Sequence, residues 1–238
     1  EERRAKVTIA LTPVEDPTAY GLIETSSDGK VNRFLEKPSW NQVTTNMINA
    51  GTYIIEKDVL NRIPPQTNFS FERQLFPMLL EQGEPIYGYT SPAYWIDIGT
   101  PEKYLQLHRD LMRGAVKGYN LVQGKVVKIG QGCSIHVETQ IVGPVVIGDG
   151  CSISRGVKIF GPVVIGKNNI IGEDTVIDSS ITWQNNSFGV KVNLKNCMLA
   201  NDCFLGDNSG AENSVLGDHV TISRNTRLGQ GSRIWPPG

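Results

Sequence analysis

Few residues of this 238-residue chain have a type and a position that suit chemistry, and the clearest of them lie near the ends of predicted strands. Asp97 lies three residues ahead of Thr100, where its carboxylate could bind a divalent cation or form the turn before a helix. Glu36 and Lys37 stand together before Pro38, where they could bind a ligand or could simply end a strand. The residues alone leave both interpretations of each group open.

Other kinds of chemistry have less support. The histidines could act as a general base, but His108 falls in a predicted helix and His136 and His219 fall in the repeat, where His136 follows an inward isoleucine and should face outward or occupy a corner. The four cysteines form no CxxC pair, which argues against a zinc site. The net charge of −1 gives no basis for binding nucleic acid. The longest apolar runs fall short of the roughly 20 residues that span a bilayer, and no signal-peptide pattern is present. We therefore expect a cytoplasmic protein that binds neither nucleic acid nor membrane.

Residues 1–114 alternate between strand-like and helix-like segments and predict an α/β domain. The strands are expected at 7–12, 20–25, 30–36, 48–55, 86–90 and 94–98, and the helices at 56–63, 71–80 and 101–112. Asp28-Gly29 is typical of a hairpin turn, and Thr100 is expected to cap the last helix. The apolar stripe of that helix is formed by Tyr104, Leu107 and Leu111.

This α/β part contains few strands and no glycine-rich phosphate loop. A sheet of this size would expose one edge and part of one face. We therefore expect the domain to be incomplete, with its N-terminal half outside this chain. Tyr94 and Trp95 are expected in the core of the domain rather than at a ligand.

The C-terminal half repeats an isoleucine every sixth residue. A helix requires a period near 3.6 and a strand a period of 2, so neither explains this spacing. Two successive eighteen-residue segments, from Ile129 and from Ile147, are identical at eleven positions. Three six-residue sides make one coil, which predicts a parallel β-helix of hexapeptide repeats over residues 127–238, after a linker at 115–126. The inward residues are Ile129, Ile135, Ile141, Ile147, Ile153, Ile159, Ile165, Ile171 and Ile177.

Beyond Ile177 the period becomes irregular. Trp183 continues it, and it returns at Leu199, Leu205, Leu216, Ile222, Leu228 and Ile234. We therefore expect a bulged or lengthened corner in 184–198. Flat faces and open ends of such a β-helix favour assembly, so we expect a homo-oligomer formed through it. The repeat could also be purely structural.

An ordered set of short motifs resembles the sugar-1-phosphate nucleotidyltransferases. The motifs are YGLIE at 20–24, FLEKP at 34–38, NAGTYII at 49–55 and YWIDIGTPEKY at 94–104, followed by the hexapeptide repeats. They look most like the mannose-1-phosphate guanylyltransferase and glucose-1-phosphate nucleotidyltransferase branches. The resemblance implies a partial Rossmann-like α/β domain followed by a left-handed β-helix. It also implies that the family's glycine-rich triphosphate loop and a second metal-binding aspartate lie outside this chain, which alone should be inactive.

The resemblance further implies nucleotidyl transfer from a nucleoside triphosphate to a sugar 1-phosphate, with Mg²⁺ as cofactor. Asp97 matches a metal ligand, and Lys37 matches the cation on the sugar phosphate; both are the expected catalytic residues. Glu36 matches the acceptor of hydrogen bonds from sugar hydroxyls. The remaining expected sugar contacts are Tyr20, Gly21, Asn49 and Gly51.

Within this class, we expect a mannose-1-phosphate guanylyltransferase that uses GTP. The alternatives are a glucose-1-phosphate thymidylyl- or uridylyltransferase, a non-catalytic subunit that binds nucleotide sugar, and a hexapeptide acyltransferase. An intact glycine-rich loop upstream would favour catalysis over a regulatory role. Bound coenzyme A on the β-helix would favour the acyltransferase.

Overall fold

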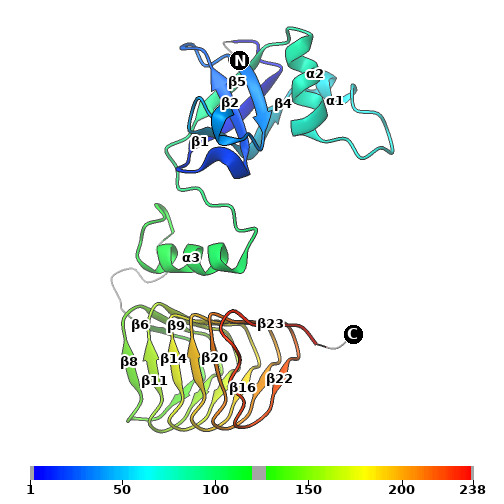
Figure 1. The fold of residues 1–238 in the computed structure, drawn as a ribbon. Coiled ribbons are helices and arrows are strands. Elements are labelled where there is room, and N and C mark those ends of the chain that lie inside the picture. Colours follow the sequence, from blue (N-terminus) through cyan, green and yellow to red (C-terminus); the bar gives the residue numbers. More distant parts are fainter. Residues whose placement is uncertain (1–2, 120–126, 237–238) are drawn as a thin grey trace. The chain divides into compact units, whose positions relative to one another are not determined.

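The computed structural model describes residues 3–119 and 127–236 (Figure 1). Most of the predicted linker, residues 120–126, lies outside the described residues. The chain divides into two compact units, Glu1–Trp95 and Ile96–Gly238. Every helix among the described residues is too short or too polar to traverse a bilayer.

The first unit is built on a five-stranded sheet. Its strands are β1 (Val7–Pro13), β2 (Gly21–Thr25), β3 (Val31–Glu36), β4 (Met47–Ile55) and β5 (Ile86–Thr90), and their spatial order is β3-β2-β4-β1-β5. Only the β1–β5 pair is parallel. Short 3₁₀ turns, η1 (Pro17–Ala19) and η2 (Trp40–Gln42), lie in the connections. The predicted hairpin joins β2 to β3.

Helices cover one face of this sheet. They are α1 (Lys57–Leu60), the π-helical turn η3 (Phe71–Leu75) and α2 (Phe76–Glu81). Phe76 and Leu79 are fully buried in one cluster with Val7, Ile9 and other residues of β1, β2 and β5. The helix expected at 56–63 is only one turn long, because Pro64 disfavours helical geometry at the residue before it.

The other face of the sheet is open among the described residues. The side chains that alternate with the core of β1 and β4 line a cavity of about 470 Å³, with Thr8, Ala10, Thr52 and Ile54 on its wall. Ile54 is 75% exposed and Tyr89 is 62% exposed. Alternation along a strand explains this division, since neighbouring side chains point to opposite faces.

The strand expected at 94–98 does not form, so that prediction is wrong. A strand requires backbone pairing with a neighbouring strand, and among the described residues no strand of the sheet pairs with 94–98. Local contacts replace them. The indole N–H of Trp95 donates to the carbonyl oxygen of Ala50 at 3.0 Å, and the backbone N–H of Gly99 donates to Asp97 Oδ1 at 3.1 Å.

The second unit contains a parallel β-helix, as the six-residue period predicted (Figure 1). Its strands form three sheets whose neighbouring strands all pair in parallel. The first sheet contains β7 (Ser134–Ile135), β10 (Ser152–Ile153), β13 (Ile170–Ile171), β16 (Ser187–Phe188), β19 (Phe204–Leu205) and β22 (Thr221–Ile222). The second contains β8 (Gln140–Val142), β11 (Lys158–Phe160), β14 (Val176–Asp178), β17 (Asn193–Lys195) and β20 (Gly210–Glu212). The third contains β6 (Val127–Ile129), β9 (Val145–Ile147), β12 (Val163–Ile165), β15 (Ile181–Thr182), β18 (Met198–Leu199), β21 (Val215–Leu216) and β23 (Arg233–Ile234).

The inward ladder is confirmed from Ile147 to Ile177, where every predicted isoleucine is buried. At the open end of the stack the first coil is covered on one side only, so Ile129 is 49% exposed and Ile135 and Ile141 are partly buried. Leu199, Leu205, Leu216 and Ile222 are buried as expected.

The lengthened corner expected in 184–198 is absent, and that prediction is wrong. Coils are eighteen residues long up to Ile177, as in Ile159↔Ile177, and seventeen in the following turns, as in Ile177↔Leu194. The last paired coil is eighteen residues long again, as in Val215↔Arg233. The change lies earlier, where Asp178 aligns with Phe160 but Ile181 aligns with Val164. The corner of 178–181 is therefore one residue shorter than its predecessor. Thr182, not Trp183, fills the inward position, and Trp183 is 40% exposed.

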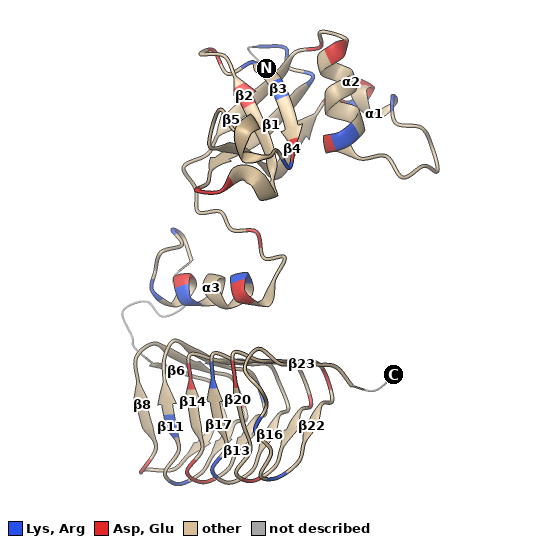
Figure 2. Ribbon diagram, in the orientation of Figure 1, with Lys and Arg blue, Asp and Glu red and all other residues tan. Residues whose placement is uncertain are grey.

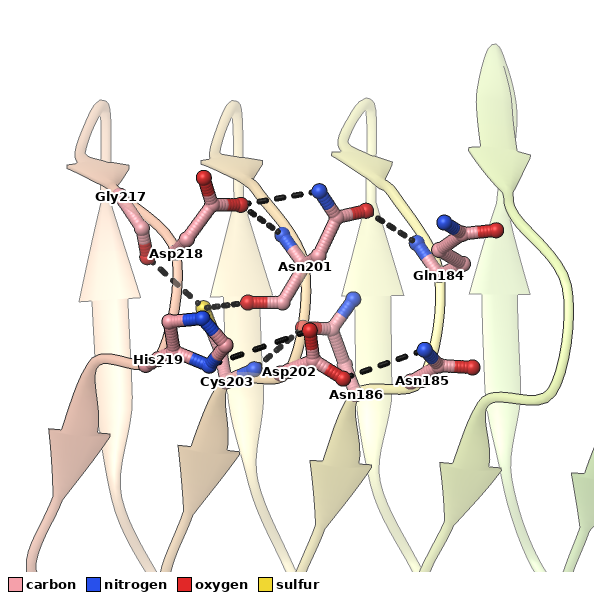
Figure 3. A network of polar contacts seen from close by, with 9 residues as sticks. All are labelled: Gln184, Asn185, Asn186, Asn201, Asp202, Cys203, Gly217, Asp218 and His219. Carbon is pink, nitrogen blue, oxygen red and sulfur yellow. Dashed lines mark hydrogen bonds and ion pairs between the residues drawn. The ribbon is translucent and has the colours of Figure 1, made fainter.

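Columns of amide and carboxylate side chains connect successive coils at the corners (Figure 3). Asn185 Nδ2 donates to Asp202 Oδ1 at 3.1 Å, and His219 Nδ1 lies 3.8 Å from Asp202 Oδ2. All three residues have positive φ, which Asn and Asp tolerate better than most residues. Inside the coil, Asn186 Oδ1 accepts from the backbone N–H of Cys203 at 2.8 Å. These ladders explain the asparagine and aspartate at the repeat corners.

Helix α3 (Pro101–Met112) lies along the outside of the seven-stranded sheet. Thr100 Oγ1 caps it, accepting from the N–H of Lys103 at 3.3 Å. Arg109 bonds Asn196 and Glu102 pairs with Arg233, both at 2.9 Å. Seven helical residues span about 10 Å, which matches the rise of two coils. Figure 2 shows acidic and basic residues along α3.

The most buried residues of α3 are Leu105 and Met112, whereas Tyr104, Leu107 and Leu111 are only half-buried. The predicted stripe is therefore displaced around the helix. Leu105 lines a cavity together with Val215, which belongs to an apolar column at the outward positions of the seven-stranded sheet. The column consists of Val146, Val164, Ile181, Met198 and Val215.

Candidate functional site

Gly21 and Glu36 lie side by side where β2 begins and β3 ends. They are register partners, and the backbone N–H of Lys37 donates to the carbonyl oxygen of Tyr20 at 2.9 Å. A Cβ on Gly21 would lie 3.1 Å from Glu36 Oε2 and 2.8 Å from Phe34 Cζ. Glycine therefore leaves the space in which the Glu36 carboxylate lies.

Lys37 is exposed and has a φ of +49°. This left-handed conformation costs an L-residue with a side chain roughly 1–2 kcal/mol. Such strain is concentrated at functional sites, where the surrounding structure holds it in place. The conformation occurs at the boundary between β3 and the buried Pro38.

A bulge in β4 shapes the neighbouring part of the site. Ile9 pairs with Tyr53 and Leu11 pairs with Asn49, so three residues of β4 face the single residue between Ile9 and Leu11. Gly51, in the middle, has a φ of +75°, which glycine adopts without strain. Its N–H donates to Asn49 Oδ1 at 2.9 Å. Bulges of this kind re-aim side chains near functional sites.

The bulge and the β2–β3 ends are joined in one region. Leu22 pairs with Ile48, which places Gly21 beside Asn49 across the two strands. The ring of Tyr20 meets that of Trp95 edge-on at 5.5 Å, and Trp95 bonds Ala50 in the bulge. The residues that the structure brings together are thus Tyr20, Gly21, Glu36, Lys37, Asn49 and Gly51. Trp95 is half-buried and ties the bulge to Tyr20, whereas the sequence predicted only a core position.

Sequence reasoning missed two residues behind Asn49. Tyr53 Oη accepts from Asn49 Nδ2 and donates to Glu72 Oε1, both at 2.7 Å. Burial, together with the Glu72 carboxylate, raises the pKa of Tyr53, and Glu36 adds to this effect. Partial burial by itself would raise the pKa of Glu72, but hydrogen bonds from Tyr53, the backbone and Ser70 outweigh it and lower that pKa. The motif Ser-Phe-Glu alone gives no sign of this role.

Asp97 belongs to the second unit, unlike the other predicted site residues. It is exposed, and Oδ1 accepts from Gly99 N–H in the turn before α3, so the turn interpretation is part of its role. Its carboxylate has the oxygen chemistry that Mg²⁺ prefers and fits a single ligand. Across residues 3–119 and 127–236, no three or more His, Cys, Asp or Glu side chains are grouped to hold a metal ion.

The histidines are each engaged in local structure. His108 Nδ1 lies 3.0 Å from the carbonyl oxygen of Tyr104, one turn earlier in α3, and burial lowers its pKa. His136 Nδ1 accepts from the backbone N–H of Glu138 at 3.1 Å, and His219 ends the corner column with Asp202. They lie on separate elements, which gives no support to an acyltransferase site.

Comparison with known proteins finds a matching family model in each half of the chain. Residues 1–114 match the family model of nucleotidyl transferases, and residues 141–236 match the model of the GMPPB C-terminal domain. A mannose-1-phosphate guanylyltransferase of Mycobacterium tuberculosis is 38% identical over 165 residues, which cover 60% of this chain and 45% of that protein. The catalytic subunit beta of mannose-1-phosphate guanylyltransferase from Drosophila pseudoobscura pseudoobscura is 35% identical, over 54% of this chain and 37% of that protein.

A glucose-1-phosphate adenylyltransferase of Desulfitobacterium hafniense aligns with more of the chain at lower identity. It is 27% identical over 276 residues, which cover 98% of this chain and 63% of that protein. The chain therefore spans between about a third and two thirds of the length of these curated relatives.

Proposed function

The chain belongs to the sugar-1-phosphate nucleotidyltransferase family, and from that premise we propose that it carries the sugar-phosphate subsite of an enzyme that makes a nucleotide sugar. The observation that carries the proposal is the cluster at the ends of β2 and β3 and the bulge of β4. There, two glycines leave room beside a carboxylate and an amide, next to an exposed lysine.

In the proposed reaction, a phosphate oxygen of the sugar 1-phosphate attacks the α-phosphorus of a nucleoside triphosphate. The bond between that phosphorus and the oxygen bridging to the β-phosphate breaks, and pyrophosphate leaves with the electron pair. Both reactants are polyanions, so positioning and neutralisation of charge supply most of the rate.

The residues of the first unit would bind and orient the sugar phosphate. Glu36 would accept hydrogen bonds from sugar hydroxyls, since an ionised carboxylate only accepts. Lys37 would neutralise the phosphate from its exposed position directly after β3. Gly51 would let the sugar ring approach the backbone, because a Cβ there would meet no protein atom within 4 Å. Tyr20 and Gly21 would border the same ring.

Asp97 would supply one ligand to a divalent cation. When bound, Mg²⁺ supplies positive charge between the phosphate groups of the two reactants. Asp97 itself would contribute a carboxylate oxygen to the cation, while the N–H of Gly99 holds Oδ1 in the turn before α3.

We propose mannose 1-phosphate and GTP as the substrates. The support is similarity, since the guanylyltransferases of two organisms are 35% and 38% identical and a match to the GMPPB C-terminal domain covers the β-helix. Glucose 1-phosphate is the second candidate, favoured by the adenylyltransferase relative and by a UTP–glucose-1-phosphate uridylyltransferase of Synechocystis at 32% identity.

A substrate matrix tests both assignments. Mannose 1-phosphate and glucose 1-phosphate would each be combined with GTP, UTP, dTTP and ATP, using the whole protein that contains this chain. Pyrophosphate release should be fastest with mannose 1-phosphate and GTP, and Asp97→Asn should abolish most of it. Faster release with glucose 1-phosphate would reassign the sugar, and no release with any pair would contradict the proposal.

We also propose that the protein forms a homo-oligomer through its β-helix. The first coil leaves Ile129, Val137 and Val142 49%, 91% and 58% exposed, and its strands are unpaired on one side among the described residues. Exposed apolar side chains and open strand edges favour association. Light scattering of residues 115–238 at increasing concentration tests this, and a strictly monomeric result for this part of an oligomeric protein would contradict it.

A further inference from the structure

Behind Asn49 lies a chain of hydrogen bonds that the proposed reaction does not yet use. It runs from Asn49 Nδ2 to Tyr53 Oη and on to Glu72 Oε1, with two contacts of 2.7 Å. Ser70 Oγ donates to Glu72 Oε2 at 3.0 Å, so both oxygens of the carboxylate are occupied. The side chains of Asn49, Tyr53 and Glu72 are all partly buried.

The direction of each hydrogen bond follows from the donors available. An ionised carboxylate can only accept, so the hydroxyl of Tyr53 must donate its single proton to Glu72. Tyr53 Oη then has only lone pairs for Asn49, which must present its NH₂ group. The other end of the same amide agrees, because Asn49 Oδ1 accepts from the N–H of Gly51 at 2.9 Å. Two independent contacts thus fix one orientation of the Asn49 amide.

The tyrosine hydroxyl is held in place by packing of its ring. Tyr53 meets Phe76 at 5.1 Å and Phe71 at 5.8 Å, both edge-on, and Phe76 is fully buried. Edge-to-face rings have a defined preferred geometry, so they limit rotation of Tyr53. Glu72 is fixed by its position in the first turn of η3, two residues after the capping residue Ser70.

We propose that Tyr53 and Glu72 are positioning residues that set the orientation of the Asn49 amide for binding the sugar phosphate. The inference rests on the proposed function, because it assigns the ligand of Asn49 to that reaction. The amide keeps one N–H and one lone pair of Oδ1 for the ligand. The fixed N–H suits an oxygen acceptor, either a sugar hydroxyl or a phosphate oxygen. A rotated amide would offer its oxygen there instead and would repel a phosphate.

The test measures the Kd of mannose 1-phosphate by calorimetry on the full chain. Tyr53→Phe keeps the ring and removes the hydroxyl, and it should raise Kd roughly 3–10-fold, the worth of one positioned hydrogen bond. Tyr89→Phe makes the same chemical change on the open face of the sheet and should leave Kd unchanged. Glu72→Ala should raise Kd to a similar extent, and Glu72→Gln should restore most of the affinity because its amide oxygen can still accept from Tyr53.

A double variant separates positioning from a general loss of structure. In an Asn49→Ala background, Tyr53→Phe should have no further effect on Kd, since the amide that it orients is gone. The side-chain NH₂ signals of Asn49 in NMR spectra should also be protected from exchange in the wild type and lose that protection in Tyr53→Phe. Melting temperatures of Tyr53→Phe and Tyr89→Phe should agree within a few degrees.

The outcomes distinguish the two proposals. If the wild type binds mannose 1-phosphate and Tyr53→Phe binds it equally well, the positioning role is wrong while the proposed function stands. An additive loss in the Asn49→Ala background would also overturn the positioning role. If the wild type binds no sugar 1-phosphate although the Asn49 amide is protected in NMR spectra, the proposed function is wrong. The assignment of the sugar phosphate as the ligand of Asn49 is then wrong as well.

Discussion

Gly21→Ala should damage both the packing of the first unit and the proposed sugar subsite. The added Cβ would lie 2.8 Å from Phe34 Cζ, closer than real Cβ contacts, so the ring must move. That ring packs edge-on against the fully buried Phe76 at 5.8 Å, which leaves it little room. The Cβ would also lie 3.1 Å from Glu36 Oε2 and would displace the carboxylate.

The magnitude is a difference of two effects. Overpacking a well-filled site costs about 1–3 kcal/mol. Replacing glycine by alanine within a strand gains roughly 0.5–1 kcal/mol, because the unfolded chain loses conformational freedom. We therefore expect Gly21→Ala to lower the free energy of unfolding by up to about 2.5 kcal/mol. The Kd for mannose 1-phosphate should rise as well, since Glu36 is moved.

Urea unfolding and calorimetric titration measure the two effects separately. Thr25→Ala, at the exposed end of the same strand, is the control and should change stability by less than about 1 kcal/mol and leave Kd unchanged. If Gly21→Ala is as stable as the wild type and binds the sugar phosphate equally well, Glu36 does not lie against Gly21 and the site geometry is wrong.

Three further predictions concern other parts of the molecule. Ile153→Ala should cost about 2–5 kcal/mol through the cavity it leaves in the β-helix, whereas the outward-facing Lys158→Ala should cost under about 0.5 kcal/mol, as thermal unfolding would show. In the whole protein, Asp97→Asn should lower kcat roughly 10²-fold or more, and Glu36→Gln should instead raise KM for the sugar phosphate about tenfold; an unchanged kcat and magnesium dependence in Asp97→Asn would leave Asp97 as a turn residue only. Folding lowers the pKa of Glu72, so the ionised carboxylate stabilises the fold above the ordinary carboxyl range, and this stabilisation is lost as pH falls through the folded pKa. Urea unfolding from pH 7 to pH 3 should therefore show that the loss of stability caused by Glu72→Gln becomes smaller at low pH. A loss of stability that stays constant over this pH range would contradict the prediction.

The sequence was sufficient where one local signal decided the structure. The six-residue isoleucine period predicted the β-helix and its inward column from Ile147 to Ile177. Short β-forming runs and Asp28-Gly29 predicted β1 to β5, and Thr100 predicted the start of α3. Gly21 and Gly51 remain predicted site residues, and the structure gives a local reason for glycine at each: a close contact at Gly21 and a positive φ at Gly51.

The sequence was insufficient where the local structure depends on a partner segment far away in the chain or on a change of one residue in the coil length. The run at 94–98 has strand-forming residues but no described neighbour to pair with. The corner between Asp178 and Ile181 is one residue shorter than the corner before it, which changed the register of the following coils. The inward residue there is the polar Thr182, so the apolar pattern did not reveal the change. The contact between Asn49 and Glu72 passes through Tyr53 and joins segments far apart in sequence, so no motif announced it.

The most direct test of the account is an NMR titration of the chain with mannose 1-phosphate, in which the chemical shifts of the backbone amides are monitored. The account predicts that the largest changes centre on Gly21, Lys37 and Gly51, at the ends of β2 and β3 and the bulge of β4. Lys37→Ala should reduce these changes, and inorganic phosphate alone should affect mainly Lys37. Shifts confined to the β-helix, or no shifts at millimolar ligand, would contradict the claim that this unit carries the sugar-phosphate subsite.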